Sequence, residues 1–253
     1  MLLKLRGYVF IFLLILSMVL YWPIPVVMRL FLPEKKVHAV ATFWGDMVLF
    51  LLKYVLGITY RVKGGENIPD KPCVVLSKHQ SALDIFVLLR IFTPQTSPFK
   101  KELLKIPFFG WVLAVTNPIV IDRKAGRQAL KVLVKKGKEK LQKGFWVLLY
   151  PEGTRALPGQ RGRYKSGGVL LAQKAGVDIV PVAINTGLFW QKGKGVINNG
   201  VVDIVVGQPM ATNEKDIKTL TAEVGDWIEE NSLAITLNHP YYLAMQQEHL
   251  TEE

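Results

Sequence analysis

The sequence predicts an α/β fold: a mostly parallel central sheet flanked by helices, preceded by an N-terminal membrane-associated helical pair. Short, continuous apolar runs rich in β-branched residues alternate with longer segments of helical character along most of the chain. Such runs are typical of strands buried on both faces, and their alternation with helices favours a parallel sheet. Half of the 253 residues are hydrophobic and only 21% are charged, so the chain can bury a sizeable core and wholesale disorder is excluded.

An uncharged run of 22 residues, from residue 7 to residue 28, lies near the N-terminus between flanking basic residues. About 20 apolar residues suffice to span a bilayer. Two prolines interrupt the run, and Tyr21 and Trp22 resemble an interfacial aromatic belt. A cleaved signal peptide is the competing interpretation, but the Ala-x-Ala pattern at residues 39–41 lies about 18 residues beyond Tyr21, too far for the usual cleavage region. The sequence therefore favours a retained anchor.

A second apolar run, residues 43–60, contains Asp46 and Lys53 and is weaker as a membrane span. It fits an amphipathic helix in the membrane interface, or a core helix of the soluble domain. Together the two runs predict a helical pair that dips into one leaflet or crosses it. We therefore divide the chain into a membrane-associated helical segment, residues 1–63, and an α/β domain, residues 64–253.

The expected elements of the α/β domain follow one another without a long linker or an internal repeat. Strands are predicted at residues 73–76, 118–121, 145–150, 179–184 and 201–206. Helices are predicted at residues 81–91, 127–142, 167–174 and 214–231. Ligands and catalytic groups of open α/β sheets gather beyond the carboxyl ends of the strands, so the segments that follow the strands are the candidates for a site.

The net charge of +12 points to an anionic partner: phosphate, a lipid surface or nucleic acid. The charge is local, because 17 Lys and Arg stand against 4 Asp and Glu between Lys100 and Lys174. This basic middle suits an anionic membrane surface. Nucleic acid is disfavoured, since the sequence has no zinc-finger spacing or other binding module and its aromatic residues concentrate in apolar runs. The single cysteine, Cys73, excludes an internal disulfide, and no cluster has metal-ligand spacing.

The first polar segment, Ser77-Lys78-His79-Gln80-Ser81-Ala82-Leu83-Asp84, directly follows a predicted strand. The spacing of His79 and Asp84 lets the carboxylate reach the imidazole and fix its orientation. The other ring nitrogen is then free to take a proton from a hydroxyl. The alternative is structural: Ser81 and Asp84 fit a helix capping box, and His79 fits a hydrogen-bonded turn.

Two further polar segments follow predicted strands: Ile121-Asp122-Arg123 and Tyr150-Pro151-Glu152-Gly153-Thr154-Arg155. In the second, a glycine lets the backbone approach a ligand, successive N–H groups can cradle an anion, and arginine can bind phosphate bidentately. Glu152 would repel a phosphate, so we expect it to orient Arg123 or Arg155, or to accept from a substrate hydroxyl. Taken singly, each arginine is more typical of a surface salt bridge.

Taken together, the motifs His-x-x-x-x-Asp, Ile-Asp-Arg, Pro-Glu-Gly-Thr-Arg and Ile-Val-Pro-Val (residues 179–182) stand in a distinctive order. In these motifs the chain resembles the glycerolipid acyltransferase family, in particular its bacterial 1-acylglycerol-3-phosphate (lysophosphatidate) acyltransferases, over about residues 74–206. The segments at residues 100–103, 106–110 and 164–167 also match, and the family is expected to have the apolar N-terminal pair. One departure is Lys78, where the family often has Asn.

The resemblance implies transfer of a fatty acyl group from acyl-CoA or acyl carrier protein to the 2-hydroxyl of lysophosphatidate, forming phosphatidate in phospholipid biosynthesis. His79 would act as general base with Asp84 orienting it, and Glu152 would organise the site. The substrate phosphate would be held by the following residues: Arg123, Gly153, Thr154, Arg155, and Lys100 or Lys101. No cofactor or metal is implied. The expected location is a membrane, with the catalytic domain on the cytoplasmic side of a bacterial inner membrane.

Two alternatives stay open at this point. The same residues fit acylation of glycerol 3-phosphate or of another lysophospholipid. A protein of a different class, a basic membrane-anchored lipid-binding protein without catalysis, also fits the charge and the apolar N-terminus. It predicts that His79 is dispensable.

Overall fold

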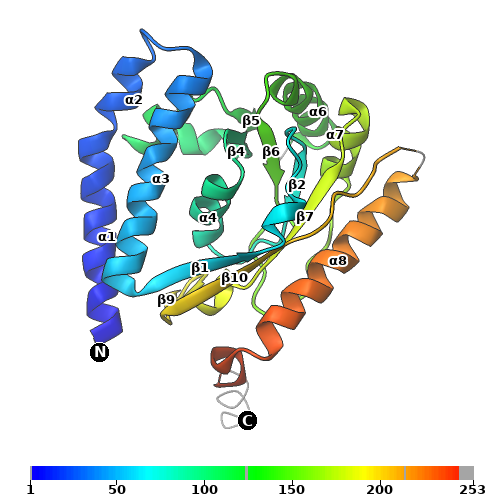
Figure 1. Ribbon diagram of the computed structural model, residues 1–253. Helices are drawn as coiled ribbons and strands as arrows, with labels where there is room; N and C mark the ends of the chain where they lie inside the picture. Colours follow the sequence, from blue (N-terminus) through cyan, green and yellow to red (C-terminus); the bar gives the residue numbers. More distant parts are fainter. Residues whose placement is uncertain (1, 123–124, 214, 245–253) are drawn as a thin grey trace.

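The chain begins with three helices in the computed structural model, which describes residues 2–122, 125–213 and 215–244. They are α1 (Leu2–Tyr21), α2 (Pro23–Met28) and α3 (Glu34–Leu56). Two prolines at the start of α2 separate it from α1, because proline lacks the backbone N–H that would continue the hydrogen-bond ladder. Helices α1 and α3 pack side by side along one flank of the molecule (Figure 1).

The second apolar run forms two elements instead of the single helical stretch predicted. Helix α3 already begins at Glu34, and it ends at Leu56. Gly57 then adopts the left-handed conformation (φ 68°) and donates its N–H to the carbonyl of Lys53, which closes the helix. Strand β1 (Ile58–Lys63) follows directly. The prediction of one element through residue 60 was wrong, because the apolar side chains continue from the helix into the strand without a polar break.

The central sheet has six strands within the described residues, in the order β1-β10-β7-β2-β6-β3. Besides β1 they are β2 (Val74–Ser77), β3 (Gln95–Thr96), β6 (Trp146–Leu149), β7 (Ile179–Ile184) and β10 (Gly200–Val206). Strands β7, β2, β6 and β3 run parallel, whereas β10 is antiparallel to β7 and parallel to β1. The mostly parallel sheet predicted from the sequence is confirmed.

One predicted strand lies outside this sheet. The strand expected at residues 118–121 is β5 (Ile119–Ile121), which pairs in parallel with β4 (Pro98–Lys100) in a separate two-stranded sheet. The sequence pattern identified the strand but could not show its partner, because pairing depends on residues distant along the chain. The remaining described elements are short: helix α5 (Phe109–Val115), strands β8 (Trp190–Gln191) and β9 (Gly195–Val196), and single turns at Gly65–Asn67, Lys101–Lys105 and Thr186–Leu188.

Helices cover both faces of the central sheet (Figure 1). On one face, α3 and α4 (Leu83–Ile91) share a core with Val75 of β2. On the other, α6 (Arg127–Gln142), α7 (Gly167–Ala175) and α8 (Ile217–Leu237) share a second core with Val74 and Leu76. Alternate residues of β2 thus enter opposite cores, as the pleat requires, and the prediction of strands buried on both faces is confirmed.

The N-terminal helices combine a docked side and an exposed apolar side. Leu2–Met28 and Glu34–Leu56 are both long and apolar enough to cross a membrane. Only 22% and 28% of their most apolar windows are buried, so most of these side chains lie outside the core. Phe10, however, is fully buried with its ring 5.6 Å from that of Trp190. These exposed apolar surfaces are consistent with membrane association. The division of the chain into two segments after residue 63 stays a prediction. Strand β1, which ends at Lys63, belongs to the central sheet although it lies in the N-terminal segment of that division.

Candidate active site

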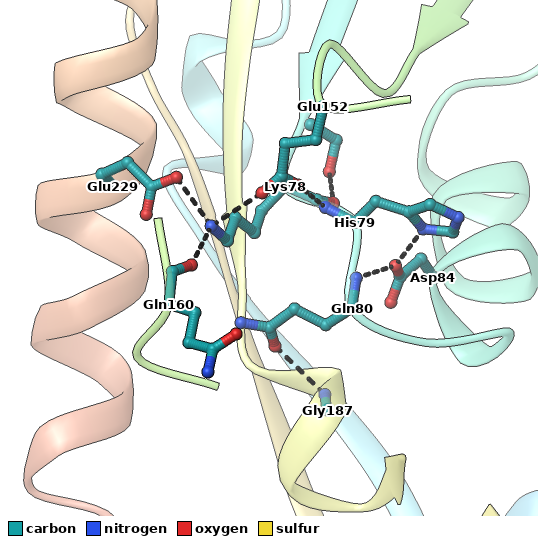
Figure 2. Close-up of polar contacts among 9 residues, drawn as sticks. Lys78, His79, Gln80, Asp84, Glu152, Gln160, Gly187 and Glu229 are labelled. Carbon is teal, nitrogen blue, oxygen red and sulfur yellow. Dashed lines mark hydrogen bonds and ion pairs between the residues drawn. The ribbon is translucent and has the colours of Figure 1, made fainter. Parts of the chain in front are cut away.

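His79 and Asp84 face each other at the carboxyl end of β2, with His79 in the turn and Asp84 in the first turn of α4 (Figure 2). Nδ1 of His79 lies 2.8 Å from Oδ2 of Asp84. The Asp84 side chain is fully buried, and that of His79 is 15% exposed. Because an ionised carboxylate only accepts hydrogen bonds, Nδ1 is the donor in this contact, and in the neutral imidazole Nε2 is then the nitrogen with the free lone pair. The contact predicted from the spacing is present, and the catalytic role of the pair stays a prediction.

The Asp84 carboxylate also closes the turn that carries His79. Its Oδ2 accepts from the backbone N–H groups of Gln80, at 2.8 Å, and Ser81, at 3.0 Å. The hydroxyl oxygen of Ser81 in turn accepts from the N–H of Leu83 at 3.1 Å. The capping contacts and the imidazole contact therefore coexist on one carboxylate. This coupling holds the ring and the turn as a unit.

Three neighbouring parallel strands, β7, β2 and β6, end at this site. After β7, the hydroxyl of the fully buried Thr186 donates to Oδ1 of Asp84. Beside it, the N–H of Gly187 donates to Oε1 of Gln80 at 3.1 Å. Thr186 was not predicted as a site residue, because its only signal in the sequence is its position just beyond a predicted strand.

The ring of Tyr150 stacks on the imidazole of His79, with ring centroids 3.9 Å apart and planes inclined by 18°. Burial, and then the charge of Asp84, raise the pKa of Tyr150 well above its ordinary value, whereas the charge of Arg155 lowers it. Tyr150 is therefore a neutral phenol whose ring covers one face of the imidazole.

Glu152 contacts the His79 turn, and its predicted role in orienting an arginine or accepting from a substrate hydroxyl stays a prediction. Its Oε2 accepts from the backbone N–H of His79 at 2.9 Å, and its Oε1 lies 2.9 Å from the ammonium nitrogen of Lys78. Burial raises the pKa of Glu152, while Lys78 and the His79 N–H act to lower it. A nearby ammonium and amide thus compensate the carboxylate for its burial.

Lys78, the departure noted in the sequence, is a buried cation. Its side chain is 1% exposed, and its ammonium lies 2.6 Å from Oε1 of Glu229 on α8 and 2.8 Å from the carbonyl oxygen of Gln160 (Figure 2). Glu229 was not predicted as a site residue. It stands in a long amphipathic helix, where an acidic residue gives no signal of its own.

The candidate phosphate ligands after β6 are Gly153, Thr154 and Arg155. Gly153 has φ 71° and donates its N–H to the carbonyl of Tyr150 at 3.0 Å, so that amide takes part in the turn. Thr154 is exposed and Arg155 is half-buried. The glycine is required here for its left-handed backbone.

Two other candidate phosphate ligands are adjacent in the chain: Lys100 is the last residue of β4, and Lys101 begins the turn that follows it. Lys100 is paired with Ile121 in the strand register, and Nζ of Lys101 lies 2.7 Å from Oδ2 of Asp122. The structure thus joins the lysine pair to the Ile-Asp-Arg segment, while Arg123 itself lies outside the described residues. No group of three or more His, Cys, Asp or Glu among the described residues could hold a metal ion.

A family model described as acyltransferase matches residues 59–185. The match runs from β1 to the end of β7 and contains His79, Asp84, Glu152 and Arg155. The chain belongs to the acyltransferase family. This membership makes the chain an enzyme and excludes the alternative of a non-catalytic lipid-binding protein. Helices α1 to α3 and α8 lie outside the matched residues.

Individual acyltransferases resemble the chain over most of its length. It is 42% identical over 205 residues to the 1-acyl-sn-glycerol-3-phosphate acyltransferase of Pseudomonas aeruginosa, covering 78% of this chain and 80% of that protein. It is 37% identical to the Saccharomyces cerevisiae protein of the same name, over 64% of this chain and 55% of that protein. The crystal structure of the 1-acyl-sn-glycerophosphate (LPA) acyltransferase PlsC from Thermotoga maritima has the same fold, with a TM-score of 0.77, 24% identity, and coverage of 92% of this chain and 95% of that one.

Proposed function

We propose that this acyltransferase transfers a fatty acyl group from a thioester donor, acyl-CoA or acyl carrier protein, to the 2-hydroxyl of 1-acylglycerol 3-phosphate. The product would be phosphatidate. The observation that carries the proposal is the His79–Asp84 pair at the carboxyl end of β2, with Nδ1 bonded to the buried carboxylate. The similarity to 1-acyl-sn-glycerol-3-phosphate acyltransferases of Pseudomonas aeruginosa and Saccharomyces cerevisiae supports the choice of acceptor.

In the proposed mechanism, His79 acts as general base through Nε2. Asp84 holds the Nδ1–H tautomer and stabilises the imidazolium that forms when the 2-hydroxyl loses its proton. The alkoxide attacks the thioester carbonyl, and the thiolate leaves after the tetrahedral intermediate collapses. The hydrogen bonds of the nearby serines are consistent with direct attack, without a serine nucleophile. Ser81 Oγ accepts from the backbone N–H of Leu83, and Ser77 Oγ donates to the carbonyl of Lys78. Neither hydroxyl is held by His79 as an activated nucleophile would be.

The acceptor and the donor are tested together in one experiment. Purified protein in mixed micelles is given lysophosphatidate or glycerol 3-phosphate, each with acyl-CoA and with acyl-loaded carrier protein, and the lipid products are quantified. We expect phosphatidate from lysophosphatidate with at least one donor. Preferential acylation of glycerol 3-phosphate would replace the proposal by its alternative.

We expect Arg155→Lys to raise KM for lysophosphatidate by about 10-fold, because lysine keeps the charge but loses the planar bidentate contact to phosphate. Arg163→Lys, at an exposed position of the same loop, is the matched control and should leave KM unchanged. Monoacylglycerol, which lacks the phosphate, should be a poorer acceptor than lysophosphatidate for the wild type, and this preference should shrink in Arg155→Ala. An unchanged preference in Arg155→Ala would remove this arginine from the phosphate site.

The exposed apolar side of α1 is proposed to bind the membrane surface, so that a two-tailed product never has to enter water. Burying each CH₂ group contributes about 0.8 kcal/mol, which strongly favours lipid for long acyl chains. Phe12 and Leu20 are 64% and 68% exposed on this side. The double variant Phe12→Glu, Leu20→Glu should bind phospholipid vesicles in flotation assays several-fold less than the wild type.

The matched control for the membrane prediction is Leu233→Glu, Leu237→Glu, which alters two exposed apolar residues of α8. This control should float like the wild type. Equal binding of all three proteins would contradict attachment through α1.

A further inference from the structure

The ammonium group of Lys78 is a buried positive charge that joins the turn after β2 to the loop between β6 and α7 and to helix α8. It contacts Glu152 after β6, at 2.9 Å, Glu229 on α8, at 2.6 Å, and the carbonyl oxygen of Gln160 in the loop between β6 and α7, at 2.8 Å. A buried ammonium is costly unless such partners surround it. The three contacts therefore form one unit, in which the removal of any partner affects the others.

This unit ends on the backbone of His79. The Glu152 carboxylate uses one oxygen for Lys78 and the other for the N–H of His79, at 2.9 Å. Figure 2 shows the resulting path from Glu229 through Lys78 and Glu152 to His79. The loop between β6 and α7 passes close to the Glu152 carboxylate at Gly162, where an added Cβ would lie only 2.5 Å from Oε1 of Glu152. Little space is left for the carboxylate to move.

We propose that Lys78 and Glu229 are positioning residues for acyl transfer, through which helix α8 holds the Glu152 carboxylate against the backbone N–H of His79. The inference rests on the proposed function. Glu229 stands on α8, outside residues 59–185 that the family model matches. Neither residue touches the reacting atoms; both act on the orientation of the imidazole.

The charge balance explains why both residues are needed. Two carboxylates converge on one ammonium, and Glu152 is the more deeply buried of the two, with 1% of its side chain exposed against 15% for Glu229. Without Lys78 the two carboxylates would face each other uncompensated, which favours protonation of the buried one. A protonated Glu152 is a weaker acceptor for the His79 N–H. Without Glu229 the ammonium loses its tie to α8, and Glu152 loses a fixed partner.

The test compares two carboxylates of α8 that each face a cation of another segment. Glu229→Gln removes the negative charge that faces Lys78 at the buried contact, whereas the control Asp226→Asn removes the charge of the exposed ion pair with Arg161, at 2.5 Å. We expect Glu229→Gln to lower kcat by about 10-fold with KM for lysophosphatidate changed by less than about twofold, as for partners that orient a catalytic group. Asp226→Asn should keep wild-type kcat and KM.

A spectroscopic readout separates positioning from a general loss of structure. The chain has four histidines, so selective ¹⁵N labelling gives few imidazole resonances, and His79→Ala assigns the one of His79. Glu229→Gln should shift the His79 resonances and leave the others in place, and Asp226→Asn should shift none. If Glu229→Gln keeps wild-type kcat and an unshifted His79 resonance, the inference is wrong. It is equally wrong if Asp226→Asn has the same effects.

A second pair of variants keeps the test decisive if Glu229→Gln does not fold. Lys78→Asn leaves Glu152 and Glu229 without their cation, whereas Lys78→Asn combined with Glu229→Gln removes one of the two negative charges. The double variant should have a higher kcat than Lys78→Asn alone, because the two changes are coupled. A double variant whose kcat is no higher than that of Lys78→Asn would overturn the inference. A wild-type enzyme that does not acylate lysophosphatidate would instead overturn the proposed function, and the His79 resonances would still decide the positioning role.

Discussion

Replacement of His79 by alanine is expected to lower kcat for acyl transfer by about 10²- to 10⁴-fold, the contribution of a general base. The fold should survive, because the imidazole is only one of four groups that donate to the Asp84 carboxylate. The backbone N–H groups of Gln80 and Ser81 and the hydroxyl of Thr186 remain in place. Initial rates in mixed micelles, together with thermal unfolding, measure the two effects separately.

The control for this prediction is His239→Ala, which removes a half-buried histidine in the segment after α8. It should keep wild-type kcat. If His79→Ala retains wild-type acyl transfer while folded, the proposed mechanism is wrong and His79 is a turn residue only.

Asp84→Asn is expected to lower kcat by about 10²-fold or more, because a neutral amide no longer stabilises the imidazolium or enforces the Nδ1–H tautomer. Its stability should change little. The amide oxygen can face the three N–H donors while its NH₂ group faces the hydroxyl of Thr186, which can accept as well as donate. In this variant, kcat therefore reports the loss of imidazole orientation, and thermal unfolding checks that the His79 turn is preserved.

Asp84→Ala separates the two tasks of the carboxylate. It leaves the buried N–H groups of Gln80 and Ser81 without their acceptor, at a cost of about 1–3 kcal/mol for each unsatisfied group. We expect a similar loss of kcat in both Asp84 variants but a lower melting temperature only for alanine. Equal stability of the two variants would contradict the capping role, and wild-type kcat in Asp84→Asn would contradict the orienting role.

Local sequence was sufficient for the features that depend on neighbouring residues. The alternation of apolar runs and helical segments predicted the layers of the domain, and β2, β6, β7 and β10 lie where strands were expected. The contact between His79 and Asp84 was predictable because both residues belong to one strand–turn–helix unit, whose geometry places positions five apart within reach. The break after Leu56 was less visible, since a single glycine ends α3 inside a continuous apolar run.

Only the tertiary structure decided which distant groups surround this pair. Thr186 reaches Asp84 because β7 lies beside β2 in the sheet, and Glu152 reaches the His79 backbone because β6 lies on the other side. Burial then determines which charged groups must be paired. In the sequence Lys78 resembles an ordinary surface lysine, but its ammonium is enclosed in the structure and needs a partner. Helix α8 supplies that partner, Glu229. Strand order and helix placement determine such pairs, and no periodicity along the chain encodes a contact between residues 78 and 229.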